Sequence, residues 1–487
     1  MPVPTQKTLL AFPRFFGVPR SSSITLVRIG TVMAGLLLLA ALLQRVPGFV
    51  NQHAISGPFW GLFVAVMLGC YWFGYQALQK VQSGENAVPI IVAFASGFCL
   101  LSFLITPFHS IDLSGYINIG WQQAGHGINP YVTMLADIPN RDRDPMFQPS
   151  PWEFTPCAYG FLFCRIANLF CLPGQRDLAL LLFRALGVVV FLATGWIVWR
   201  GSRRFGVSNP ERSLFLFLWN PLVLMMFTVE VHNDLWMGLC TALSIFFAVA
   251  GTWLPVIPCL VLAVLLKHYA VILLPFILLY MVRHFGWKKT GVSSVLGLLL
   301  GIAIAWPYLV DIQKFRIAGQ LQNAGEMHNS LLTILYFPFE IGQKPFPWLE
   351  SWGRCFLDVL RPAGLGAFLV LTLSLGWRRL RAPGYDARTL VYDAVLLHFV
   401  LICLVTPKFY CWYLGMFFPL AFWLPEEDRL RRAVLAISCA QLLSLTFIDH
   451  AHFLNVLVML VLPLAWVWKR RQSSPGLLVH AGKAGLS

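Results

Sequence analysis

The chain has 487 residues, of which 58% are hydrophobic and only 12% are charged, and its mean hydropathy is +0.70. Soluble domains carry about 25% charged residues, so this composition excludes a water-soluble protein, a disordered chain and a disulfide scaffold. It predicts an all-α, polytopic bundle of transmembrane helices. The net charge of +15 fits the basic cytoplasmic loops of a membrane protein, and no nucleic-acid partner is expected.

Apolar runs predict about fourteen spans, since a spanning helix needs about 20 apolar residues and fewer where it is bent or shielded by protein. The predicted spans are 24–43, 57–78, 88–106, 178–199, 213–228, 235–251, 254–266, 269–282, 291–310, 352–376, 390–405, 409–424, 433–448 and 453–468. This arrangement puts both termini and most of the 36 lysines and arginines on one side. Because basic residues concentrate in cytoplasmic loops, both termini are predicted to be cytoplasmic in a multi-pass plasma (inner) membrane protein.

Two long external stretches interrupt the spans, and residues 1–487 are otherwise interpreted as a single polytopic membrane domain. The first, 107–177, is predicted to be a catalytic loop region with amphipathic helices, and the second is 311–351. Residues 151–177 are interpreted as interfacial or re-entrant, because the basic cluster at 200–212 would lie outside if they crossed the membrane. The short, proline-containing spans 254–266 and 269–282 predict a broken hairpin with an external tip.

Asp112 opens the first cluster of polar residues, directly after a predicted span. Tyr116 lies four residues further on, which places both side chains on one face of a helix. A carboxylate at the membrane surface is suited to accept a proton from an acceptor hydroxyl. The alternative is a structural one, since aspartate is also a preferred helix N-cap.

Two further clusters lie on the same predicted side. Glu230-Val-His232-Asn233-Asp234 is a short turn in which capping by Asn233 or Asp234 would leave Glu230 and His232 unexplained. Lys267 and His268 occupy the predicted hairpin tip, and Lys408 precedes Trp412 and Tyr413. Charges at membrane depth usually face a cavity, although snorkelling to lipid headgroups is the alternative for the lysines.

All of these positions are predicted to lie on the same side of the membrane, so they could form a single site. Its cationic groups would suit an anionic substrate, such as the phosphate of a lipid-linked sugar. Asp142 and Asp144 are the best carboxylate pair for a divalent cation, Mg²⁺ or Mn²⁺. The flanking Arg141 and Arg143 favour a self-neutralised loop instead. No metal is therefore assigned, and a divalent cation stays an open alternative.

The eleven cysteines form no metal-binding or disulfide pattern. Cys157, Cys164 and Cys171 recur every seven residues, which predicts one helix face with neighbours about 10 Å apart, too far to bridge. They are interpreted as packing residues.

The motifs, taken in order, resemble the integral-membrane GT-C glycosyltransferases, especially the polyprenol-phosphate-mannose-dependent mannosyltransferases. The matching elements are Asp112-x-x-x-Tyr116 with Gly120, Gly127-x-Asn129-Pro130-Tyr131, Thr155-Pro156-x-x-Tyr159-Gly160, Trp219-Asn220-Pro221, His232-Asn233-Asp234, Lys267 before Pro275, and Pro407 with Trp412-Tyr413. The resemblance implies inverting transfer of a hexose, expected to be mannose, from a polyprenyl-phosphate donor to a lipid-linked or glycan acceptor among membrane lipids at the external face.

The resemblance also implies roles for individual residues. Asp112 would be the general base, His232 and Asp234 would line the substrate pocket, and Lys267 and Lys408 would steady the leaving phosphate. The remaining substrate-binding candidates are Tyr116, Asn129, Tyr131, Glu230, Asn233, His268, Trp412 and Tyr413.

This chain departs from the family pattern at two points, and a rival function stays open. Asp112 follows the third predicted span rather than the first, and Trp121 stands where related sequences often have arginine. The rival is a lipid or polysaccharide flippase or a secondary transporter, which would place polar residues along a path to both membrane faces.

Overall fold

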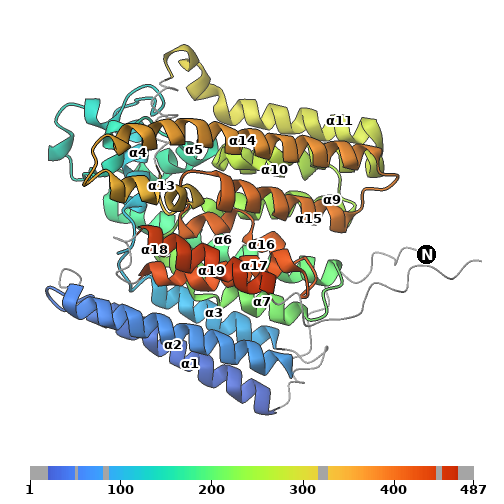
Figure 1. Cartoon of the computed structure of the whole chain (residues 1–487), viewed down its shortest axis with the longest axis horizontal. Helices are drawn as coiled ribbons and strands as arrows, with labels where there is room; N and C mark the ends of the chain where they lie inside the picture. Colours follow the sequence, from blue (N-terminus) through green and yellow to red (C-terminus); the bar gives the residue numbers. More distant parts are fainter. Residues whose placement is uncertain (1–19, 50–52, 81–86, 316–326, 446–451, 470–487) are drawn as a thin grey trace, which may run out of the picture.

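The computed structural model describes residues 20–49, 53–80, 87–315, 327–445 and 452–469. Long helices run side by side along the bundle, with α1, α2 and α3 at one edge and α11 and α14 at the other (Figure 1). Within this described part the chain is helical, and its β-type pairing is a single isolated bridge between His328 and Lys408. The predicted all-α membrane bundle is confirmed.

The helices follow one another with few long connections. In chain order the α-helices are α1 (Arg20–Leu43), α2 (His53–Gln79), α3 (Val88–Ser102), α4 (Asp112–Ala124), α5 (Phe161–Cys171), α6 (Arg176–Arg204), α7 (Pro210–Leu218), α8 (Pro221–Leu224), α9 (Asp234–Ala250), α10 (Val256–Leu266), α11 (Leu274–Leu309), α13 (Leu331–Gly342), α14 (Leu349–Arg381), α15 (Ala387–Phe399), α16 (Phe418–Ala421), α17 (Arg429–Gln441), α18 (His452–Val456) and α19 (Leu462–Lys469).

Short 3₁₀ and π segments connect or extend these helices. They are η1 (Leu135–Asp137), η2 (Arg141–Arg143), η3 (Pro151–Phe154), η4 (Met225–Val229), η5 (His268–Leu273), η6 (Ile312–Lys314), η7 (Val400–Val405), η8 (Cys411–Met416), η9 (Leu442–Leu445) and η11 (Leu457–Val461). Such segments often occur where a helix is interrupted at a functional site, and η3, η4, η5 and η8 all border the site described below.

Six helices of the described part are long and apolar enough to cross a membrane, and a seventh span is added if the pair Pro210–Leu218 and Pro221–Val229, bent by 50°, is counted as one. The predicted number of fourteen is therefore not confirmed. Several predicted spans are short helices of 10 to 17 residues. The two predicted spans 269–282 and 291–310 fall in one helical stretch, broken at Gly286, whose φ of 80° only glycine adopts readily.

The bend between α7 and α8 has a local cause. Asn220 leaves the helical conformation, and its side chain accepts hydrogen bonds from the backbone N–H groups of Leu222 (3.0 Å) and Val223 (3.3 Å). Pro221 occupies the first position of the new helix, where its missing N–H costs nothing. The Trp219-Asn220-Pro221 element therefore restarts a helix and shapes the approach to the Glu230 turn.

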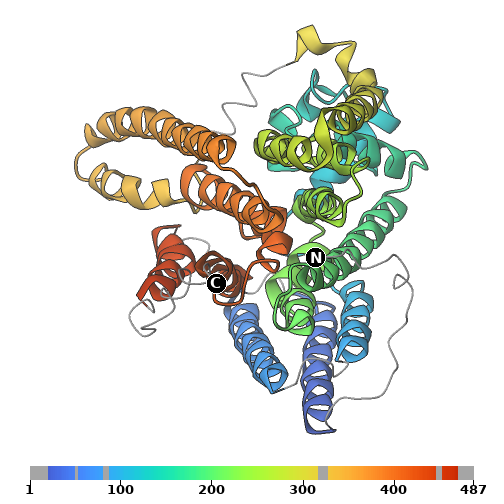
Figure 2. The ribbon, with the colours of Figure 1, turned by 90° about the vertical axis from the view of Figure 1, so that its right-hand side faces the viewer.

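The stretch 107–177, which is predicted to be external, folds as helices and turns at one end of the bundle, at the left of Figure 1. Figure 2, turned by 90°, shows the helices arranged around a centre with α13 and α14 forming a separate arm. Helix α5 packs on α4 through Gly120, where a Cβ atom would lie 2.2 Å from the carbonyl oxygen of Ala167. The close contact requires glycine and fixes α4 over the end of the bundle.

The prediction for the three cysteines is wrong at Cys157. Helix α5 begins only at Phe161, so Cys157 lies in the preceding extended segment and folds back. Its sulfur lies 3.5 Å from that of Cys164, and both residues are buried. A seven-residue spacing predicts about 10 Å only within one continuous helix.

Candidate active site

A cavity of about 460 Å³ lies at the end of the bundle that α4 covers. Four separated segments of the chain contribute to its wall. They are the stretch from His109 to Leu135, the stretch from Trp152 to Tyr159, the hairpin tip Lys267–Tyr269, and the segment Thr406–Tyr413. The predicted convergence of distant polar residues is therefore seen for Asp112, Lys267, His268, Lys408, Trp412 and Tyr413, which all line this cavity.

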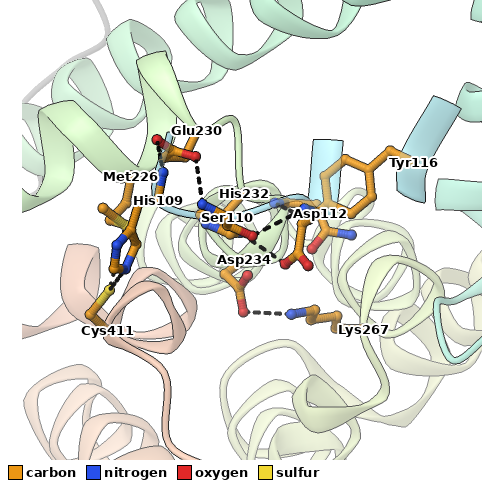
Figure 3. Close-up of polar contacts among 11 residues, drawn as sticks. His109, Ser110, Asp112, Tyr116, Met226, Glu230, His232, Asp234, Lys267 and Cys411 are labelled. Atoms are coloured by element: carbon orange, nitrogen blue, oxygen red, sulfur yellow. Dashed lines mark hydrogen bonds and ion pairs between the residues drawn. The ribbon is translucent and has the colours of Figure 1, made fainter. Parts of the chain in front are cut away.

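Asp112 is the first residue of α4, and its carboxylate is directed away from the helix it begins. The N-cap position is occupied by Ile111, and no side chain caps this end. The Asp112 carboxylate instead lies beside His232, with Oδ2 3.3 Å from Nδ1 of the imidazole (Figure 3). The alternative interpretation of Asp112 as a helix cap is therefore not supported.

The environment of Asp112 favours its ionised form. Burial raises the pKa of the Asp112 carboxyl, but contact with His232 and the positive charge of Lys267 outweigh burial and hold this pKa below its usual value. A general base must be ionised when its substrate arrives. Asp112 thus meets that requirement at neutral pH.

His232 is fully buried beneath Asp112. Its ring is stacked on that of Trp412, with centroids 3.8 Å apart and planes 7° apart. Apart from the Asp112 contact, neither ring nitrogen has a hydrogen-bond partner among the residues that the structure describes. The orientation of this imidazole is therefore set by stacking rather than by a backbone hydrogen bond.

Asp234 and Lys267 form the second charged pair of the site. The Lys267 ammonium donates a 2.6 Å hydrogen bond to Oδ1 of the fully buried Asp234 and lies 4.9 Å from the ring centre of Tyr413. Asp234 begins α9, while α10 ends at Lys267, whose backbone is extended. Since α9 and α10 pack together, the start of one helix meets the end of the other.

Glu230 does not face the cavity but holds the segment that leads to Asp112. Its Oε1 accepts hydrogen bonds from the backbone N–H groups of Phe108 (2.9 Å) and His109 (3.1 Å), and its Oε2 accepts one from Ser110 (3.2 Å). Burial raises the pKa of Glu230, while these three donors oppose that shift. The next residue, Val231, has a φ of 59°, a strained conformation for a β-branched residue that is found mostly at functional sites.

Tyr116, Asn129, Tyr131 and Asn233 lie behind the cavity wall rather than on it. The Tyr116 hydroxyl accepts a hydrogen bond from the backbone N–H of Asn233 (3.4 Å). Asn129 donates to the carbonyl of Tyr308 (3.2 Å), and Tyr131 donates to the carbonyl of Tyr159 (2.7 Å). Through these hydrogen bonds the four residues brace the cavity wall.

The residues that line the cavity include His109, Trp152 and Tyr410, to which sequence reasoning gave no role, and Tyr159, which it quoted only as part of a motif. Burial is the main cause that lowers the pKa of His109, to about 4, so its ring is neutral at pH 7. Trp152 lies between Asp112 and Lys408, whose ammonium is 5.9 Å from its ring. His109 directly precedes the Ser110-Ile-Asp112 element, but nothing in the sequence signals the place of Trp152.

The Asp142–Asp144 loop gains no support as a metal site. Asp142 is exposed and lies 3.9 Å from Arg141, and Asp144 accepts a hydrogen bond from the backbone N–H of Met146. In the residues that the structure describes, no group of three or more metal-ligating side chains gathers.

The family model described as "Alpha-(1->6)-mannopyranosyltransferase, N-terminal domain" matches residues 21–283, which is more than half of the chain. The chain belongs to this family. It is a multi-pass membrane glycosyltransferase of the mannosyl-transferring, GT-C type, as the order of its motifs predicted. The rival function of a flippase or transporter gains no support from this membership.

Two curated relatives carry the same name. The chain is 26% identical to alpha-(1->6)-mannopyranosyltransferase A of Mycobacterium tuberculosis over 396 residues, which cover 77% of this chain and 72% of that protein. It is 25% identical to alpha-(1->6)-mannopyranosyltransferase A of Corynebacterium glutamicum over 183 residues, or 37% of this chain and 36% of the relative.

The residues matched by the family model contain most of the cavity wall but not all of it. Asp112, His232, Asp234 and Lys267 lie within residues 21–283. The wall segment Thr406–Tyr413 lies outside that range and supplies the ring that stacks on His232. The site is therefore assembled from the matched region and from a later part of the chain.

Proposed function

We propose that this mannosyltransferase moves mannose from a polyprenyl-phosphate-linked donor to a hydroxyl of a lipid-linked or glycan acceptor. The observation that carries this proposal is the Asp112 carboxylate, in contact with His232, at the wall of a cavity that also contains two lysines, Lys267 and Lys408. A base and a set of cations in one cavity suit a reaction in which a hydroxyl attacks and a phosphate leaves.

The reaction is a single displacement at the anomeric carbon. The acceptor oxygen forms a bond to C1 of the sugar while the bond between C1 and the phosphate oxygen breaks, and that oxygen keeps the electron pair. Asp112 takes the proton of the attacking hydroxyl. Following the name of the relatives, the product is an α-(1→6) linkage; an α product formed with inversion requires a β-linked donor.

The two lysines bring positive charge to the cavity from two different wall segments. Lys267 pairs with the buried Asp234 at 2.6 Å. Lys408 belongs to the segment Thr406–Tyr413, and its ammonium lies 5.9 Å from the ring centre of Trp152. We therefore assign the stabilisation of the leaving phosphate to both lysines together.

The cavity is assigned to the external face of the membrane. The segments around it carry few basic residues, whereas basic residues gather at and just after the C-terminal end of α6 (Arg200, Arg203, Arg204 and Arg212) and in the first turn of α17 (Arg429, Arg431 and Arg432). Basic residues concentrate on the cytoplasmic side. A lipid-linked donor, unlike a nucleotide sugar, is available on the external side.

The test uses the purified full-length protein in lipid nanodiscs with radiolabelled polyprenyl-phosphate mannose and an α-mannoside oligosaccharide as acceptor. Wild type should transfer label into an α-(1→6) product, identified by NMR, and should not use GDP-mannose. Asp112→Asn should reduce the rate at least about 100-fold. Asp142→Asn, which removes an exposed carboxylate of the same external region, is the matched control and should retain activity. Transfer from GDP-mannose, or a parental rate in Asp112→Asn, would overturn the proposal.

A further inference from the structure

A column of four aromatic rings connects the second external stretch to Asp112. His328 stacks on Tyr410 with ring centroids 4.4 Å apart, and Tyr410 stacks on Trp412 at 4.6 Å with planes 6° apart. Trp412 stacks in turn on His232 at 3.8 Å. His232 then contacts Asp112 at 3.3 Å, so the column ends at the proposed base.

The far end of the column is attached to the wall segment through the backbone. The N–H of His328 donates to the carbonyl of Pro407 (3.0 Å), and the carbonyl of His328 accepts from the N–H of Phe409 (2.8 Å). This is the isolated parallel bridge between His328 and Lys408. The ring of His328 is therefore held over Tyr410 by the main chain on both sides.

The near end has no comparable attachment. His232 is fully buried, and within the described part of the chain neither of its ring nitrogens has a hydrogen-bond partner beyond Asp112. A histidine that orients a reactive group is usually fixed by a hydrogen bond to its second nitrogen. Here the flat contact with Trp412 takes that place, so any tilt of Trp412 changes the approach of Nδ1 to the Asp112 carboxylate.

Trp412 is in turn held by the ring on its other face, Tyr410, and by an edge contact from His109 at 6.0 Å. Tyr410 has His328 as its outer neighbour. We propose that His328 is a positioning residue for mannosyl transfer, which acts through Tyr410 and Trp412 on His232 and so on Asp112. This inference rests on the proposed function, because it takes Asp112 as the base.

If His328 is a positioning residue, its replacement should have specific effects on the kinetics. His328 does not line the cavity, so its loss should leave substrate binding almost unchanged and lower the rate of the chemical step. Because contact with His232 depresses the pKa of Asp112, a looser column should also move the acidic limb of the pH–rate profile to higher pH. If stacking is the important property of His328, an aromatic ring without ionisable nitrogens, such as phenylalanine, should restore both the rate and the pH profile.

The experiment compares His328→Ala, His328→Phe and the control His126→Ala in nanodiscs, with kcat and KM measured from pH 8 down to pH 2.5, so that the acidic limb of a base with a depressed pKa falls within the range. His126 is an exposed histidine that contacts Trp121 outside the column. We expect His328→Ala to lower kcat about 10-fold or more with little change in KM and an acidic limb shifted upward. His328→Phe and His126→Ala should resemble wild type.

The outcomes separate this inference from the proposed function. If His328→Ala keeps the wild-type kcat and pH profile while Asp112→Asn is inactive, the column is a packing feature and the inference fails alone. If His328→Phe is as impaired as His328→Ala, the imidazole rather than stacking is required, and the inference also fails. If Asp112→Asn retains the parental rate, the proposed base is wrong, whatever the result at His328.

Discussion

Nδ1 of His232 lies 3.3 Å from Oδ2 of Asp112, and this contact joins two residues that are 120 positions apart in the chain. Asp112 begins α4 at the surface of the bundle, whereas His232 comes from the strained turn before α9. The imidazole approaches the carboxylate from the buried side. It thus leaves the cavity side of Asp112 for an acceptor hydroxyl.

Replacing His232 by phenylalanine should separate its electrostatic role from its stacking role. The Phe ring can still stack on Trp412, but the contact that lowers the pKa of Asp112 is lost. A base with a depressed pKa stays ionised as the pH falls, so its activity is lost only at low pH. His232→Phe raises that pKa, and the acidic limb of kcat/KM should move upward by about one pH unit.

The measurement is the pH dependence of kcat/KM for mannosyl transfer from pH 2.5 to 8, a range that contains the acidic limb of a base with a depressed pKa. His126→Phe, at an exposed position, provides the matched control and should leave the limb in place. An unchanged limb in His232→Phe would show that Asp112 does not depend on the imidazole for its charge.

The charged pair Asp234–Lys267 should show strong coupling in a double-mutant cycle. Lys267→Met leaves a fully buried carboxylate without its partner, and removal of one member of a buried ion pair costs about 3–5 kcal/mol. Asp234→Asn leaves an ammonium that reaches the cavity and Tyr413, so its cost should be smaller. The double variant should lose less stability than the sum of the two.

Thermal unfolding in detergent, followed by intrinsic fluorescence, gives the midpoints of the four proteins. The pair Lys314–Asp311, which is largely exposed, is the control cycle and should show coupling below about 1 kcal/mol. Additive effects at Asp234 and Lys267 would mean that the 2.6 Å contact does not stabilise the fold.

The sequence predicts which polar residues gather, because each follows or interrupts an apolar run on the same predicted side. This pattern identified five polar residues as candidates for the site: Asp112, His232, Asp234, Lys267 and Lys408. It does not predict side-chain direction, which depends on backbone angles such as the φ of Val231. Glu230 therefore was interpreted as a substrate contact, although its carboxylate points back to the N–H groups of residues 108–110.

The same limit explains the remaining differences. Asn129 and Tyr131 belong to a recognisable motif. They donate hydrogen bonds to the carbonyl groups of Tyr308 and Tyr159, respectively, and the sequence alone does not show that these residues are neighbours. Trp152 lines the cavity because η3 packs against η1 and its ring lies beside Gly115 of α4, and the composition of that stretch gives no sign of this position. Hydropathy predicted the helical bundle, but the fourteen crossings are not confirmed, because helices of 10 to 17 residues in the described part are too short to meet the length expected of a span.

Alanine at Gly120 should disrupt the packing of α4 on α5. Its Cβ atom would lie 2.2 Å from the Ala167 carbonyl oxygen and 2.5 Å from the sulfur of Cys171, and the first of these atoms belongs to the backbone. Overpacking of this kind costs about 1–3 kcal/mol. Gly97→Ala in α3, where nothing lies within 4 Å of the new atom, should be neutral or slightly stabilising.

The thermal midpoint and the mannosyl-transfer rate should fall together in Gly120→Ala, because α4 carries Asp112. Equal midpoints for Gly120→Ala and Gly97→Ala would show that α4 and α5 are not held at this distance in the membrane.

Glu230→Gln should lower kcat without raising KM. Glutamine retains one acceptor oxygen, but its amide nitrogen would face the N–H of either Ser110 or the pair Phe108 and His109, so at least one donor loses its partner. The segment that leads to Asp112 should shift, and a misplacement of about 1 Å can reduce a rate 100-fold. We expect a decrease in kcat of about 10- to 100-fold, measured with saturating donor and acceptor. Glu427→Gln, an exposed change outside the cavity, is the control. A raised KM with an unchanged kcat would instead return Glu230 to the substrate-binding role that its sequence pattern first suggested.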